Sequence, residues 1–226
     1  PPKLEKIPSI GAYSRFNLEK VVALKPDLVL ATTHGNPKDQ VLHLRELKVP
    51  VVVVDTESFA QIEESIRIVG QAMGAAKEGQ QLAERFKAGL ANIRAKAAKE
   101  LAGGRKPRVL LQVGDEPLIV VGKQSFLNEA IQAVGGENLY GDAGSHYPRP
   151  ATEDAVHRNP DVIIVLALGK DLKPFNEMAG RWAQFPGMKA VKSKQVRVLQ
   201  GDSILRPTLR HLEGLSLLQK AIHGKK

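Results

Sequence analysis

The sequence predicts an α/β protein made of two lobes, each with a central parallel sheet, joined by one long helix. Three observations predict this class. Short, uniformly apolar runs alternate with amphipathic segments, which is the pattern of buried parallel strands separated by helices. A stretch of strong helix formers, residues 76–101, lies between two such series. Finally, LKPDLVLA at 24–31 and RNPDVIIVLA at 158–167 repeat one plan, a helix end, a Pro-Asp turn and a buried strand.

The first half predicts a strand–helix–strand unit followed by an amphipathic helix. The apolar runs at 28–32 and 49–55 are expected to be strands buried on both faces, since the second holds four consecutive valines. Residues 37–47 have helical spacing between them. In 59–74, apolar residues recur at intervals of three and four, which predicts a helix with one buried face.

The long helix is expected over 76–101 and is stopped by Gly103-Gly104. At about 1.5 Å per residue it would reach almost 40 Å. We therefore expect an N-terminal lobe at 1–75, a connecting helix at 76–104 and a C-terminal lobe at 105–226. A single stiff helix as the connection favours a small opening movement over a wide closure.

The second half repeats the α/β alternation. Its apolar runs predict strands at 108–113, 119–121, 162–168 and 195–199. Helices are expected at 125–134, 151–158, 174–183 and 207–223. Gly135-Gly136 follows a helix and is interpreted as its C-terminal cap, not as a phosphate loop.

Composition excludes several classes of function. The formal net charge is +9, but the basic residues are scattered, with local density only at 85–106 and at the tail Lys225-Lys226, so a solvated basic surface is favoured over nucleic-acid binding. The absence of cysteine excludes disulfides, thiolate metal sites and thiol nucleophiles. No G-x-S-x-G, Walker or G-x-G-x-x-G motif is present, so no enzyme is predicted. The chain begins Pro1-Pro2-Lys3 without a signal peptide, which is typical of a processed product or a piece of something longer.

Four segments carry a family resemblance, in order and over most of the chain. They are IGAYSRFNLEKVVALKPDLVLA at 10–31, VGKQSFLNEAIQAVGGENLYGD at 121–142, TEDAVHRNPDVIIV at 152–165 and LRPTLRHLEGL at 205–215. Together they resemble the helical-backbone (class III) periplasmic substrate-binding proteins of ABC importers. The segments at 35–41 and 110–126 are most similar to the cobalamin-binding branch, and the siderophore and haem binders share the scaffold.

The resemblance implies two Rossmann-like lobes, a membrane permease as partner and a ligand held between the lobes. The ligand is expected to be cobalamin or a related corrinoid, with a ferric siderophore, haem or a metal ion as alternatives. A chelate brings its own metal, so no intrinsic cofactor is expected. The protein would be periplasmic or lipid-anchored outside the cytoplasmic membrane. Family members begin with further strands before the segment that matches Pro1, so the first lobe is expected to be incomplete.

The resemblance also assigns ligand-binding positions. Tyr13 and Tyr147 match positions where cobalamin binders hold the corrin with aromatic rings, although either could be an ordinary core or surface tyrosine. Asp202 and Arg206 match residues that face the amide rim of the ligand. The alternative to ligand contact is a structural ion pair between these two residues. Arg210, one helical turn further on, would hold a carboxylate of the ligand or cap the cleft.

Glu19 and Glu153 match the exposed glutamates, one on each lobe, that pair with permease arginines. Their alternative is a helix N-terminal acid favoured by the macrodipole. The six histidines have no metal-binding spacing and are interpreted as solvated side chains. Two alternatives stay open, a meeting of His34 with His146 in the cleft, and His146 beside Tyr147 as a chelate ligand.

Overall fold

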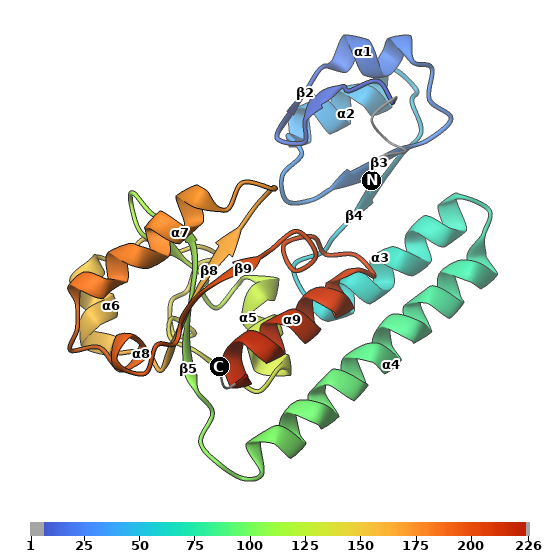
Figure 1. Cartoon of the computed structure of the whole chain (residues 1–226). Coiled ribbons are helices and arrows are strands. Elements are labelled where there is room, and N and C mark those ends of the chain that lie inside the picture. Colours follow the sequence, from blue (N-terminus) through green and yellow to red (C-terminus); the bar gives the residue numbers. More distant parts are fainter. Residues whose placement is uncertain (1–6, 225–226) are drawn as a thin grey trace. The chain divides into compact units, whose positions relative to one another are not determined.

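Strands and helices alternate along most of the chain, which confirms the predicted α/β class (Figure 1). The computed structural model describes residues 7–224, and the predicted basic tail Lys225-Lys226 and the opening Pro1-Pro2-Lys3 lie outside them. The chain divides into two units, Pro1–Ala83 and Glu84–Lys226. The division falls inside helix α4 (Ala76–Leu101), whose bounds are those expected from the sequence.

The first unit combines a small hairpin with a parallel strand pair. Its elements are β1 (Gly11–Ala12), β2 (Arg15–Phe16), α1 (Leu18–Ala23), β3 (Val29–Thr32), α2 (Lys38–Glu46), β4 (Val51–Val54), α3 (Phe59–Ala72) and the first turns of α4. Strands β3 and β4 run parallel, with Val29 opposite Val51. The core of this unit gathers Phe16, Val21 and Leu44.

The expectation that these two strands are buried on both faces is wrong. All four valines of β4 are only partly buried, and Leu30 of β3 is 48% exposed. In the described part of this unit the parallel sheet has only these two strands, so each lacks a neighbour along one edge. This strand pair is therefore not enclosed on both faces and both edges, as the central strands of a larger parallel sheet are.

Helices α3 and α4 approach each other at two glycines. A Cβ placed on Gly70 would lie 2.7 Å from the Cα of Gly79. Gly79 is one of two glycines inside the long helix. The other, Gly89, accommodates the side chain of Leu212, because a Cβ there would lie 2.5 Å from its Cδ1 atom. Both glycines in α4 are thus explained by packing.

The second unit is built on a five-stranded, mostly parallel sheet. Its elements after α4 are β5 (Arg108–Gly114), β6 (Ile119–Val120), α5 (Phe126–Ala133), β7 (Glu137–Asn138), α6 (Thr152–Arg158), β8 (Val162–Ala167), α7 (Lys173–Gly180), the 3₁₀ helix η2 (Arg181–Gln184), α8 (Lys189–Lys192), β9 (Val196–Gln200) and α9 (His211–His223). The order is β6-β5-β8-β9, and β7 also pairs with β5. Only β6 is antiparallel to its neighbour. Every residue of β8 is buried, as predicted.

The repeated Pro-Asp phrases form the same local structure in the two units. Helix α1 ends shortly before Lys25, and α6 ends just before Asn159, and both residues have left-handed backbone angles, φ +46° and +51°. A left-handed residue ends a helix, and the proline that follows prevents its continuation. Strands β3 and β8 then begin within four residues of those stops.

The last helix begins later than predicted. The helix was expected to begin at Pro207, because proline is favoured at the first helical position, but α9 starts at His211. Residues 206–210 instead form tight turns, in which the amide of Thr208 donates to the carbonyl of Arg206 and that of His211 to Thr208, both at 2.8 Å. The predicted helix at 174–183 is divided into α7 and η2, and the short elements β1, β2, β7 and α8 were not predicted. Across residues 7–224, no helix has both the length and the apolar character needed to span a bilayer.

Candidate functional site

Tyr13 of the first unit contacts a loop at the carboxyl end of a parallel strand, and Asp202, Arg206 and Arg210 of the second unit lie on such a loop. In open α/β sheets this is the edge at which ligands bind. In the first unit the loops after β3 and β4 form this edge, and in the second unit the loop after β9 does so. The two sets of residues are described separately.

Tyr13 lies in the turn between β1 and β2 and is 72% exposed. Its ring rests on the loop after β3, since a Cβ on Gly35 would lie 2.1 Å from the Cε2 atom of Tyr13. The side chain of Asn36 donates from Nδ2 to the carbonyl oxygen of Tyr13 at 2.6 Å. These contacts hold the turn that carries Tyr13 against the loop after β3. The ring itself remains exposed to solvent.

The loop after β3 is held by the same asparagine. Its Oδ1 accepts from the amide of Thr32 at 2.7 Å, and the hydroxyl of Thr32 donates to the carbonyl of His34 at 2.9 Å. Sequence reasoning missed Asn36, because its role depends on a contact with a residue 23 positions earlier. Thr32 thus fixes the loop through both its amide and its hydroxyl.

A histidine and a glutamate meet at the ends of β3 and β4. Nδ1 of His34 lies 4.0 Å from Oε1 of Glu57, with side chains 55% and 23% exposed. The loop after β4 is held by Asp55, which accepts from the amide of Glu57 at 3.2 Å and from Nε2 of Gln61 at 2.9 Å. Glu57 was not singled out from the sequence, because it has no motif around it.

In the second unit, the loop 201–210 leaves β9 beside the end of β8, where the amide of Gly201 donates to the carbonyl of Ala167 at 2.7 Å. Asp202 is partly buried, and Arg206 and Arg210 are exposed. Within the described residues no ion pair joins Asp202 to Arg206, so the structural pair considered as their alternative is not formed.

Tyr147 lies on the loop between β7 and α6 and is 43% exposed. The loop is fixed along β6, where the amides of Val120 and Gly122 donate to the carbonyls of Pro148 and His146 at 3.1 and 2.9 Å. The Tyr147 hydroxyl lies 3.4 Å from Oγ of Ser125, which caps α5. The ring of His146 is 6.4 Å from that of Tyr147.

Glu19 and Glu153 are exposed residues in the first turns of α1 and α6. Neither carboxylate has a hydrogen bond or ion pair within the described part of the chain. Asn17 caps α1 by accepting from the amide of Lys20 at 2.8 Å, so Glu19 is not needed as a cap. Both glutamates have the exposure that docking requires, and both also have the helix position that the macrodipole favours.

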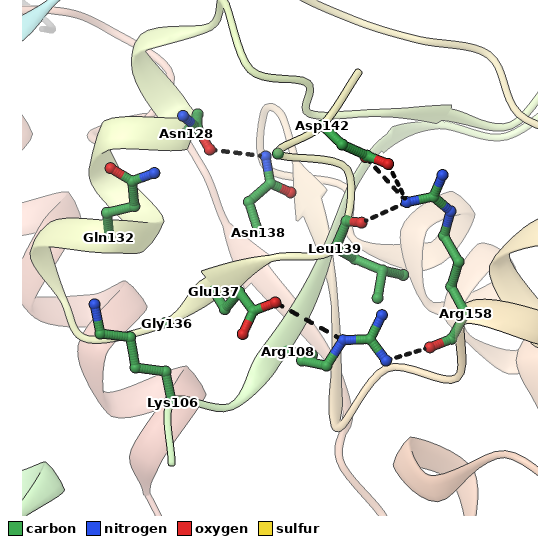
Figure 2. Close-up of a pocket in the computed structure, with 11 residues that line it drawn as sticks. Lys106, Arg108, Asn128, Gln132, Gly136, Glu137, Asn138, Leu139, Asp142 and Arg158 are labelled. Atoms are coloured by element: carbon green, nitrogen blue, oxygen red, sulfur yellow. Dashed lines mark hydrogen bonds and ion pairs between the residues drawn. The ribbon is translucent and has the colours of Figure 1, made fainter. Parts of the chain in front are cut away.

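A hollow of about 530 Å³ opens at the amino ends of β5 and β7, away from the predicted ligand residues (Figure 2). Both arginines in its lining are held by neighbouring groups. Arg158 donates to both carboxylate oxygens of Asp142 at 3.0 Å, and Arg108 donates to the carbonyl of Arg158 at 2.6 Å. The hydrogen bond from Arg158 lowers the pKa of Asp142. This paired network fastens the hollow's walls, and none of the predicted site residues lines it.

The same arginine holds α6 in place. Asp154 accepts from Nε of Arg158 at 3.0 Å and from the Tyr140 hydroxyl at 2.8 Å. Burial and that hydrogen bond raise the pKa of Tyr140, so the phenol stays protonated. The helix that presents Glu153 is therefore fixed by its neighbour Asp154.

Two α/β units that present exposed tyrosines and charged side chains from loops have the architecture of a solute-binding protein. The chain belongs to the periplasmic binding protein family, which it matches over residues 1–202.

Individual relatives agree with this assignment. The chain is 34% identical over 186 residues to the vitamin B12-binding protein of Salmonella paratyphi A, covering 82% of this chain and 68% of that protein. Its fold is similar to that of the periplasmic vitamin B12 binding protein BtuF of Vibrio cholerae, with a TM-score of 0.83, 25% identity and coverage of 98% and 84%. It is also similar to the haem-binding protein RhuT from Roseiflexus sp. RS-1, with a TM-score of 0.84, 26% identity and coverage of 99% and 85%. The predicted family and its cobalamin-related branch are confirmed.

Proposed function

We propose that this chain captures cobalamin or a related corrinoid for an ABC importer and delivers it to the membrane permease. The observation that carries the proposal is the exposed ring of Tyr13, held against Gly35 on the loop after β3. An open aromatic face at the ligand edge suits a flat, partly apolar ligand. The likeness to vitamin B12-binding proteins supports the corrinoid assignment.

The remaining predicted residues supply polar contacts. A corrin carries amide groups around its rim, which accept from arginine and donate to a carboxylate. Arg206 and Asp202, which have no ion pair with each other, match those requirements, with Arg210 as a further donor. Tyr147 offers a second ring, and its hydroxyl is already oriented by Ser125. The chelate brings its own metal, so the protein requires neither a resident ion nor a catalytic step.

Docking to the permease is assigned to Glu19 and Glu153. One exposed carboxylate on each unit, each without a partner in the described residues, would meet one arginine on each half of the permease. Charge pairs of this kind set register and orientation more than affinity. We place the protein in the periplasm or, through a lipid anchor, on the outer side of the cytoplasmic membrane.

The alternative is a haem or ferric siderophore ligand of the same transporter class. The similarity to a haem-binding protein supports it. His34, whose ring nitrogen lies beside Glu57, and His146 beside Tyr147 offer donors to an iron atom. A metal ion without a chelate is a second alternative and would use the same imidazoles.

Calorimetric titration with cyanocobalamin, with haem and a ferric siderophore in parallel, tests the proposal. Saturable one-to-one binding of the corrinoid at submicromolar concentration is expected. Binding of haem alone, with a shift of its Soret band, would replace the corrinoid by the alternative. Failure of all three ligands would contradict the proposal.

A further inference from the structure

A buried histidine lies beneath the part of the second unit that carries the predicted ligand residues. His211 is the first residue of α9, directly after Arg210, and its side chain has no exposed surface. Histidine is buried less often than the aliphatic residues, so a fully enclosed ring calls for an explanation. Its neighbours supply one.

One side of the ring faces the segment that orients Tyr147. The rings of His211 and Phe126 have centroids 5.4 Å apart and are tilted by 60°. Phe126 is the first residue of α5 and follows Ser125, whose hydroxyl lies 3.4 Å from that of Tyr147. The position of His211 is therefore coupled through two adjacent residues to a predicted ligand ring.

The ring also contacts the loop that carries Asp202 and Arg206. The backbone of Ile204 and that of Ser203 act on the ring as hydrogen-bonding neighbours do, since both raise its pKa against the effect of burial. Ile204 is fully buried and packs on α9, where a Cβ on Gly214 would lie 2.6 Å from the amide nitrogen of Ile204. The turn between Asp202 and Arg206 thus rests on His211 and on the bare backbone of Gly214.

The chemistry of imidazole explains why this position is not simply apolar. A leucine would fill the space beside Phe126, but it would offer nothing to the backbone of Ser203 and Ile204. Burial lowers the pKa of His211 to about 4, so the ring is neutral at pH 7 and carries one donor and one acceptor. A neutral ring can be buried at little cost when those groups are hydrogen-bonded.

We propose that His211 is a positioning residue for ligand binding, which holds the Ser203–Ile204 turn so that Asp202 and Arg206 face the ligand in register with Tyr147. The inference rests on the proposed function, because it assigns how that site keeps its shape. His211 does not touch the ligand. It acts through the loop backbone on one side and through Phe126 on the other.

The test compares four variants, first without ligand. His211→Leu keeps the packing and removes the ring nitrogens, and His211→Asn and His211→Gln each restore a donor at a different reach. Leu218→Ala, which empties a fully buried position further along α9, is the control for general loss of stability. Amide hydrogen exchange by mass spectrometry is followed in 201–206 and, as a reference, in β8.

His211→Leu should speed exchange in 201–206 by about tenfold with little change in β8, as expected for loss of a buried hydrogen bond. At least one of the amide variants should restore protection. Leu218→Ala should lower the melting temperature without singling out this loop. If His211→Leu alters exchange in 201–206 no more than in β8, or if neither amide variant restores protection, the positioning role is overturned.

Titration with cyanocobalamin then links the loop to the ligand. His211→Leu should weaken binding by about tenfold, with recovery in the same amide variant that restores protection. If the wild-type protein does not bind cyanocobalamin, the proposed function fails, while the exchange result still decides whether His211 holds the loop. If binding is intact in wild type and unchanged in His211→Leu, the role in ligand binding is rejected.

Discussion

The ring of Tyr13 occupies the space that a side chain on Gly35 would fill, with its Cε2 atom 2.1 Å from the position of a Cβ. Gly35 also has a backbone φ of +114°, which few other residues adopt. The glycine therefore serves both the turn and the seat of the aromatic ring. Replacing Gly35 and, as a control, another glycine with positive φ should separate the backbone strain from the loss of the seat for the Tyr13 ring.

Gly35→Ala should displace the ring of Tyr13 and weaken cyanocobalamin binding about tenfold, in addition to a loss of roughly 1–2 kcal/mol of stability from backbone strain. Gly103→Ala is the matched control, because Gly103 has φ +80° but no atom within 4 Å of its Cβ position. It should show the strain without the loss of affinity, as measured by thermal unfolding and calorimetry. Equal affinities for the two variants would argue against a ligand role for Tyr13.

Glu153→Gln and Glu19→Gln should leave ligand affinity and melting temperature unchanged, because neither carboxylate has a partner within the described residues. Each should weaken association with permease-containing membranes, and the double variant should do so most, as measured by sedimentation with vesicles. Asp154→Asn is the contrasting variant. It disturbs the bonds to Tyr140 and Arg158 and should destabilise the protein by about 1 kcal/mol. Wild-type membrane association in the double variant would remove the docking assignment.

The buried imidazole makes stability depend on pH in a defined window. Burial lowers the pKa of His211 from 6.5 to about 4, so the unfolded chain takes up the proton first as the pH falls. This contribution to stability is fully present above pH 6.5 and declines from there down to about pH 4, by roughly 3 kcal/mol in total. Urea unfolding at a series of pH values should show the decline in wild type and a shallower one in His211→Leu. Identical slopes would show that the ring does not titrate in this way.

The close approach of α3 and α4 predicts sensitivity to side-chain size. Gly70→Val would place atoms within 2.7 Å of the Cα of Gly79 and should destabilise the protein by about 1–3 kcal/mol. Gly180→Ala, in α7, meets no atom within 4 Å and should be neutral or slightly stabilising. Chemical denaturation of both variants provides the comparison. A neutral Gly70→Val would mean that the two helices can move apart freely.

The sequence predicts the regular elements well where a single physical cause governs them. Helix α4 was predicted to the residue, because strong helix formers dominate the segment, despite its two internal glycines, until the glycines at 103 and 104. The start of α9 was misplaced, because Pro207 is as suitable for a helix start as for the turn that it forms. The turn follows directly on the loop 201–206, whose Ile204 packs against Gly214 of α9, and no local sequence pattern contains that tertiary contact.

The site was less accessible from the sequence than the fold. Tyr13, Tyr147 and the charged residues were found only through family resemblance, and their roles remain predictions. Asn36 was missed because its partner is distant along the chain. Glu57 was missed because an acid after a strand is common, and its pairing with His34 depends on the register between β3 and β4.

The position of the unit boundary inside α4 has a practical consequence for dissecting the molecule into fragments. A fragment beginning at Glu84 would start in mid-helix, and the amides of its first four residues would lose their carbonyl acceptors. A fragment beginning after Gly74 would keep the helix intact and start where the chain already turns at a glycine with φ +71°. Experiments on the second unit alone should therefore carry the whole of α4, and the first unit should be expected to lose stability without its share of that helix.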